Sequence, residues 1–260
     1  MFSREGGSDS AYYLRLRLGE GAGTVNFCLV SLDVQPGPKK PRVGDDIPFY
    51  CLVTPENERK ERANNYESGL RRVLHITELK NQCLTEALAR FPETSHVIMV
   101  ESYYLKQEAA IKKLIRRYKE TADENLILGA PVWIYLKDRL LTKQVFYDGW
   151  ACPELAFYNR KGSPELPTLV QVSSVGSCLI FPRWTWEKTR FANPEYPAKI
   201  YYNWLCENSG CPVIVDMSIS FFRCIIGGRN LTRFSYPWRV FQYTNFRLRR
   251  FLSRLRTGRR

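Results

Sequence analysis

The order of strand-like and helix-like stretches in this sequence predicts an α/β fold, a single domain built on a mixed, mainly parallel sheet. In the first half of the chain, short apolar runs alternate with amphipathic helical stretches. Several of these runs end in a carboxylate, as strands do when they emerge from a buried sheet. In the second half, short strand-like runs are separated by turn residues, which favours antiparallel additions to the same sheet.

The first half predicts strands and helices in alternation. The run at 24–33 is apolar and ends at Asp33, so we expect a buried strand. Leucines recur at roughly helical spacing through 67–91 until Pro92 stops the pattern, which predicts a helix. The expected strands lie at 24–33, 47–58, 96–101 and 125–136, the last either one strand or a bent pair, and the expected helices at 67–91 and 106–122.

The second half has a different sequence pattern, because its apolar runs are shorter and turn residues separate them. Strands that follow each other this closely favour antiparallel pairing over further crossover helices. We therefore expect one compact domain over 24–232, between a polar leader at 1–23 and a basic tail at 233–260. The expected strands lie at 143–150, 169–174, 177–181 and as two short strands within 211–222, and the expected helices at 184–191 and 196–210.

Charge and cysteine content restrict the possible partners and sites. The formal net charge of +13 favours polyanionic partners, although much of the excess lies in the tail. The eight cysteines form no CxxC pair and most sit among apolar neighbours, which indicates buried reduced thiols rather than a zinc site. The N-terminus lacks an apolar signal region and no run is long enough to span a membrane, so we expect a cytoplasmic protein, peripheral at most to a membrane.

The tail is expected to form a basic amphipathic helix. Aromatic and leucine side chains fall near one face at helical spacing, and arginines fill much of the rest. This pattern is typical of an interfacial helix on an anionic membrane surface, here over 238–260. A core-docking helix with a solvated face and a nucleic-acid contact remain as alternatives, the last less favoured. The apolar positions are Trp238, Phe241, Leu248, Phe251, Leu252 and Leu255.

The segment "ITELKNQCLTEALARFPETSHVIMVESYYL" (76–105) resembles an element of nucleotide-sugar glycosyltransferases of the GT-A fold. There, a helix carrying an Arg-Asn pair leads into a strand that ends in a DxD-type motif. Lys80 and Asn81 match the pair, and Glu101-Ser102-Tyr103 matches the motif. Three later segments resemble, in the correct order, elements of the fungal capsule-associated mannosyltransferase-like families; they are 146–155, 172–191 and 201–222.

The resemblance implies transfer of a hexose, mannose being one candidate, from a nucleotide-sugar donor to a glycan or lipid-linked acceptor. It also implies Mn²⁺ or Mg²⁺ bridging the donor diphosphate. The chain departs from the pattern, because Tyr103 replaces the second carboxylate of the motif and Tyr202-Asn203 replaces an acidic pair. Hard cations prefer several oxygen ligands. Lysine or arginine could therefore neutralise the diphosphate instead, or the chain could be a catalytically impaired binding or adaptor protein.

The resemblance also assigns roles to individual residues. Each role has a structural alternative: an exposed strand end for Glu101, a packing aromatic for Tyr103, a solvated helix face for Lys80 and Asn81, and an ordinary turn around Gly176. Asp216, at the end of an apolar run, is a reserve carboxylate. The assigned roles are catalytic for Glu101, Asp148 and Glu207, donor-binding for Lys80, Asn81, Glu101 and Tyr103, acceptor-binding for Trp150, Gly176 and Asn203, and metal-binding for Glu101.

Overall fold

The computed structural model describes residues 25–33, 41–44, 47–53, 66–121, 123–137, 142–146, 151–152, 155, 168–196, 199–226 and 248. The α/β class expected from the sequence is confirmed, with two sheets and four helices in this part of the chain. The leader at 1–23, the residues Asp148 and Trp150, and the tail at 238–260, except Leu248, lie outside the described residues.

The larger sheet has seven strands in the order β2-β1-β3-β8-β4-β9-β7. Parallel pairings join β1 to β2, β1 to β3 and β4 to β9. Antiparallel pairings join β3 to β8, β4 to β8 and β7 to β9, so the sheet is mixed. The strands are β1 Phe27–Asp33, β2 Phe49–Val53, β3 His96–Val100, β4 Ile127–Gly129, β7 Leu169–Gln171, β8 Cys178–Pro182 and β9 Val213–Asp216.

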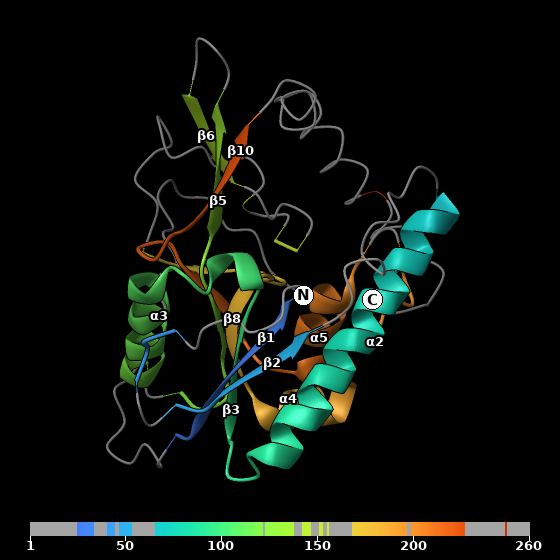
Figure 1. Cartoon of the computed structure of the whole chain (residues 1–260), viewed down its shortest axis with the longest axis vertical. Helices are drawn as coiled ribbons and strands as arrows, with labels where there is room; N and C mark the ends of the chain where they lie inside the picture. Colours follow the sequence, from blue (N-terminus) through green and yellow to red (C-terminus); the bar gives the residue numbers. More distant parts are fainter. Residues whose placement is uncertain are drawn as a thin grey trace, which may run out of the picture.

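A second sheet of three strands stands above the first in Figure 1. It has the order β10-β5-β6, with β10 parallel to β5 and β6 antiparallel to it. The apolar run at 125–136 therefore forms a bent pair, in which β4 belongs to the large sheet and β5 to the small one. The sequence predicted these strands but not their separation into two sheets. Their bounds are β5 Val132–Lys137, β6 Thr142–Phe146 and β10 Phe221–Ile226.

The helices cover the two faces of the large sheet unequally (Figure 1). Three of them pack on one face: α2 (Tyr66–Arg90), α4 (Arg183–Thr189) and α5 (Tyr201–Ser209). The fourth, α3 (Glu108–Glu120), packs on the other face. Its apolar stripe faces the sheet as the 3.6-residue period requires, with four buried side chains: Ile111, Leu114, Ile115 and Tyr118.

Each face of the sheet has its own apolar core, since side chains alternate along a strand. In β1, Cys28 and Val30 point into the core beneath α2, whereas Phe27 and Leu29 point into the core beneath α3. The central strands β3 and β8 are buried along their whole length. Burial of each aliphatic side chain in these two strands contributes on the order of 2 kcal/mol to stability. The middle of the sheet is therefore stable and holds the residues at the strand ends in fixed positions.

The strand directions gather distant parts of the chain at one edge. Strands β1, β2, β3, β4 and β9 all run the same way, so their carboxyl ends share an edge, and the antiparallel β7 and β8 begin there. Glu101, Ser177 and Asp216 consequently lie along this carboxyl edge, where ligands bind in open α/β sheets. Among the described residues, no helix is both long and apolar enough to cross a membrane.

Candidate functional site

Glu101 follows the last residue of β3 at the carboxyl edge. Its backbone N–H donates to the Ser177 carbonyl at 3.0 Å, and its own carbonyl accepts from the Tyr104 N–H at 2.8 Å. These two bonds fix the backbone and begin the 3₁₀ turn Ser102–Tyr104. The side chain is half-buried, and its carboxylate forms no hydrogen bond or ion pair with any residue that the structure describes. Glu101 therefore has an anchored backbone and a carboxylate that no described residue engages.

The turn that holds Glu101 comes from the loop between β7 and β8. Gly176 is buried, and its carbonyl accepts from the Cys178 N–H at 2.7 Å. Ser177 has a φ of 64°, a left-handed conformation that is uncommon for a residue with a side chain. Backbone strain of this kind often marks functional sites. The sequence analysis assigned a role to Gly176 of this turn, but the unusual backbone conformation is at the neighbouring Ser177.

The two tyrosines after Glu101 have opposite environments. Tyr103 is 62% exposed, so it lies on the surface beside the end of β3. Tyr104 is fully buried, and its ring meets Phe221 of β10 edge to face, with centroids 5.8 Å apart. Tyr104 thus joins the 3₁₀ turn to the small sheet, whereas Tyr103 is accessible to a ligand.

Asp216 ends β9 on the same edge, but its carboxylate is already paired. Asp216 is fully buried, and it accepts from Arg117 Nε of α3 at 2.6 Å and from the Ser218 N–H at 2.8 Å. The hydrogen bond to Asp216 raises the pKa of the Arg117 guanidinium above its ordinary value. Both oxygens of Asp216 therefore hold the protein together, which leaves little capacity for a ligand.

Lys80 lies on α2 and is 96% covered, not solvated as its polar character suggested. Its Nζ donates to the Tyr202 hydroxyl at 2.8 Å. The same ammonium lies 5.3 Å and 4.9 Å from the ring centroids of Tyr201 and Tyr202. A lysine in contact with two aromatic rings gains cation–π attraction, which stabilises the packing of α5 on α2.

Asn81 joins α2 to the end of α4. Its Oδ1 accepts from Trp186 Nε1 at 2.9 Å and from the Phe191 N–H at 3.0 Å. Its Nδ2 donates to the Phe191 carbonyl at 2.9 Å. The amide is therefore engaged with the chain through both of its polar atoms. The part played by Trp186 and Phe191 was not foreseen, because the contact joins segments far apart in the sequence.

Asn203 and Glu207 of α5 are likewise engaged with neighbouring segments. Asn203 is fully buried; its Oδ1 accepts from the Ile200 N–H at 2.9 Å, and its Nδ2 donates to Ser174 Oγ at 2.6 Å. The Ser174 hydroxyl in turn donates to the carbonyl of Ala151. Glu207 accepts from Lys199 Nζ at 2.5 Å. The contact of Asn203 with Ser174 connects the start of α5 with the loop that also holds Glu101.

A divalent cation does not fit the described residues well. They contain no group of three or more histidine, cysteine, aspartate or glutamate side chains placed to hold a metal ion. At the end of β3, Glu101 is accompanied by Ser102 and Tyr103, and Asp216 is paired with Arg117. Since Mg²⁺ and Mn²⁺ prefer several hard oxygen ligands, we assign no step to a metal ion.

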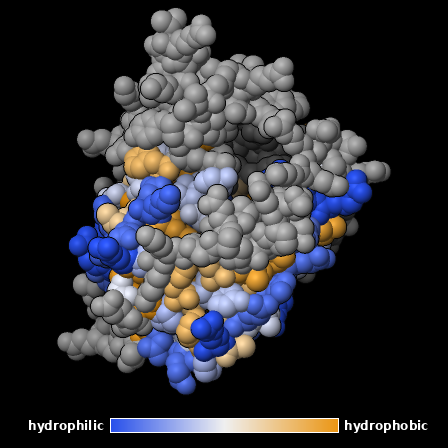
Figure 2. Space-filling model, viewed as in Figure 1, coloured by the Kyte–Doolittle hydropathy of each residue, from blue (hydrophilic) through white to orange (hydrophobic). Residues whose placement is uncertain are grey.

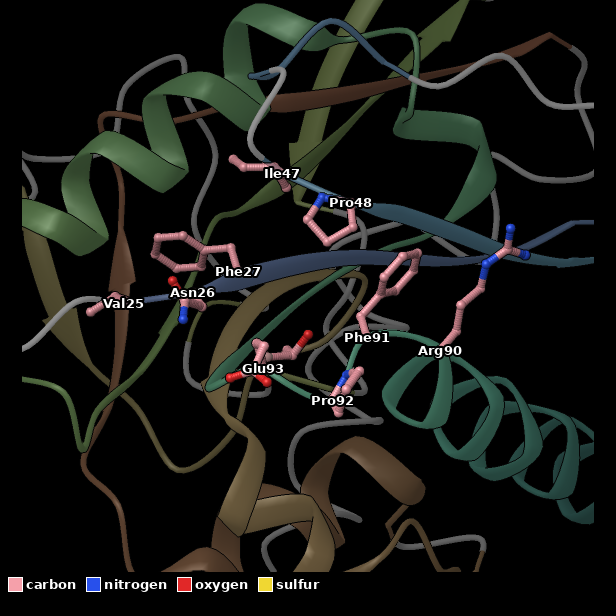
Figure 3. A pocket seen from close by; sticks show the side chains of 10 residues that line it. Val25, Asn26, Phe27, Ile47, Pro48, Arg90, Phe91, Pro92 and Glu93 are labelled. Carbon is pink, nitrogen blue, oxygen red and sulfur yellow. The ribbon is translucent and has the colours of Figure 1, made fainter.

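A cavity of about 420 Å³ lies at the opposite edge of the sheet. It is lined by residues that precede β1 and β2 and by the turn between α2 and β3, and Figure 3 shows Phe27, Pro48 and Phe91 around it. These are the amino ends of the strands. The cavity is therefore separated from Glu101 by the length of β3 and does not belong to the same site.

The chain matches no protein-family model and no curated protein.

Proposed function

We propose that this chain is a glycosyltransferase of GT-A type, which transfers a hexose from a nucleotide-sugar donor to a glycan or lipid-linked acceptor. The observation that carries the proposal is the state of Glu101, whose half-buried carboxylate at the carboxyl edge has no partner among the described residues. The common direction of β1, β2, β3, β4 and β9 also supports a mainly parallel, Rossmann-like sheet with its ligand at this edge.

The proposed chemistry requires one bond to break and one to form. The bond between the anomeric carbon and the donor diphosphate breaks, and the acceptor hydroxyl oxygen bonds to that carbon. The hydroxyl proton must pass to a base, and a carboxylate without an internal partner can accept it. We assign this role, or a hydrogen bond to the donor, to the half-buried Glu101, and contact with a sugar or a base to the exposed ring of Tyr103.

Isothermal titration calorimetry with a panel of nucleotide sugars tests the proposal. We expect the native chain to bind at least one member, and Glu101→Gln to bind it at least about tenfold more weakly, since a charge-assisted hydrogen bond becomes a neutral one. Glu93→Gln is the matched control, because Glu93 is exposed and lies at the other edge of the sheet. The proposal would be contradicted if the native chain bound none of the nucleotide sugars. It would also be contradicted if Glu101→Gln and Glu93→Gln lost affinity equally.

A second candidate is a binding protein of the same fold that no longer catalyses transfer. It is favoured by the internal contacts of Lys80, Asn81, Asn203 and Glu207, which use polar groups that the resemblance assigns to ligands. Such a protein would bind a nucleotide sugar without releasing nucleoside diphosphate. Product analysis by chromatography, with candidate acceptors present and absent, separates the two functions.

A further inference from the structure

The solvent face of α3 carries an unusual concentration of positive charge. Lys112, Arg116 and Lys119 are exposed and recur at i, i+4 and i+7, so they lie on one stripe of the helix. Lys113 lies beside this stripe, and Lys106 is exposed just before the helix begins. We call Lys112, Lys113, Arg116 and Lys119 the basic face of α3. In Figure 2, strongly hydrophilic residues gather over the position of α3 at the left of the molecule.

The acids of α3 neutralise this face only at Arg116. Glu120 is shared between Arg116, at 3.7 Å, and Arg117, at 3.2 Å. Glu108 accepts instead from the backbone N–H of Arg42. Among the described residues, none of the lysines of the basic face pairs with a carboxylate: the ammonium of Lys113 donates to the Ser218 carbonyl, and that of Lys119 lies over the Phe27 ring.

Helix stability does not account for the pattern. The helix dipole favours cations only within the last turn, and Lys112 and Lys113 lie in the first half of α3. Like charges three or four residues apart, such as Lys112 with Arg116, destabilise a helix. A face that is unfavourable to the isolated helix is expected where a negatively charged partner compensates for it.

We propose that the basic face of α3 docks the protein on an anionic membrane surface, attracted by lipid phosphates. The residue types favour this partner over nucleic acid. Arginine is the preferred reader of nucleic-acid phosphates, yet Arg117 is held by Asp216 and Arg116 is next to Glu120. Within the described part of the chain, the cations of the basic face that lack a carboxylate partner are lysines, flexible point charges that suit diffuse attraction to a charged surface. The inference rests on charge alone and not on the proposed sugar transfer.

The position of α3 gives the docking a direction. The helix begins a few residues after Tyr103, which is 62% exposed beside Glu101. Tyrosine is enriched where proteins meet membranes, because its ring is apolar and its hydroxyl is polar. The basic face runs along α3, and at its far end Lys119 lies over Phe27 at the amino edge of the sheet. Docking would therefore lay the face of the sheet that α3 covers along the lipid surface, with Tyr103 beside one end of the contact.

Vesicle flotation with the full chain tests this inference. The vesicles contain phosphatidylcholine alone, or about three parts phosphatidylcholine to one part phosphatidylserine. The variant K112Q/R116Q/K119Q removes three exposed charges and keeps good helix-forming residues. Its matched control, R71Q/R72Q/R90Q, removes three exposed charges from α2, on the other face of the sheet. A third variant, R249Q/R250Q/R254Q, removes three charges from the tail.

We expect the native chain to float only with the anionic vesicles, and the α3 variant to bind them roughly a hundredfold more weakly, since each cation near such a surface contributes about fivefold. The α2 control should remain within about threefold of the native chain. The inference is overturned if only the tail variant binds the anionic vesicles more weakly. It is overturned as well if the α3 and α2 variants lose affinity for these vesicles equally. It is also overturned if the α3 variant loses affinity for duplex DNA while its vesicle binding is unchanged.

Discussion

At the scale of single residues, His96 is held neutral by its surroundings. Its Nε2 lies 3.0 Å from the Glu124 carbonyl, which can only accept, so the proton of the neutral ring is on Nε2. Its Nδ1 then accepts from the Ser95 hydroxyl at 2.9 Å. A tilted contact with the Phe27 ring and an edge-on contact with the Tyr118 ring complete a mostly apolar environment. Desolvation by burial therefore lowers the pKa of His96.

The lowered pKa has a consequence for stability. Because the unfolded chain takes up the proton at a higher pH than the folded chain, the contribution of His96 is complete above about pH 6.5 and is lost as the pH falls toward the folded-state pKa. His96→Gln should make the urea midpoint fall less steeply than in the native chain when the pH is lowered from about 7.5 to about 5.5. If the urea midpoints of the two proteins fell equally with pH, the prediction would be wrong, because protonation of His96 would then not affect stability.

At the scale of elements, the contact between β4 and the loop before β8 is unusually close. A Cβ added at Gly129 would lie 2.2 Å from Val175 Cγ2 and 2.9 Å from Val175 Cβ. Valine is stiff about its first side-chain torsion, and Val175 is 3% exposed, so it has little room to move aside. Glycine at 129 therefore allows the loop that carries Ser177, and with it the backbone of Glu101, to sit against the sheet.

Gly129→Ala should lower the free energy of unfolding by about 2 kcal/mol, as expected when a well-packed core is overfilled. Urea denaturation measures this change. In the double variant G129A/V175A, the smaller side chain relieves the clash, so the loss should be less than the sum of the two single variants. Additive losses would mean that the cost of alanine at 129 does not come from Val175.

At the scale of the whole molecule, most of the cysteines whose side chains the structure describes lie in or against the two apolar cores, and none of these forms a disulfide. The described side chains are those of seven cysteines, all reduced thiols, of which five are buried and two, Cys51 and Cys211, are half-buried. Burial raises the pKa of Cys28 and of Cys83 to about 12. The thiols of Cys28 and Cys83 are therefore both covered and protonated near neutral pH, as the scattered, apolar sequence context of the cysteines predicted.

Alkylation should consequently report on global unfolding. With iodoacetamide at about pH 8, a thiol of pKa 12 is ionised to only about one part in ten thousand. We expect Cys51 and Cys211 to be labelled first in the native protein, and Cys28 and Cys83 only as urea unfolds the chain. Peptide mapping by mass spectrometry would follow each site. Labelling of Cys28 at the rate of Cys51 without urea would contradict this expectation.

The sequence by itself determined the secondary structure and the fold class. Continuous apolar runs predicted β1, β3, β8 and β9, and helical spacing predicted α2 and α3, because the hydrophobic period is a local property that each segment carries on its own. The bent pair of β4 and β5 was one of two possibilities left open by the apolar run at 125–136. Which strands lie side by side, and that they form two sheets, depends on pairings between distant segments.

Only the tertiary structure decided which polar side chains remain available to a ligand. Asn81 and Asn203 have the same polar groups in any sequence context, but here Phe191 and Ser174 engage them, and Lys199 pairs with Glu207. The carboxylate of Glu101 has no partner among the described residues, although its backbone is held by Ser177 where β8 begins. A hydrogen bond depends on the position of both partners in space, and the second partner is set by the folded arrangement of the chain rather than by the local sequence.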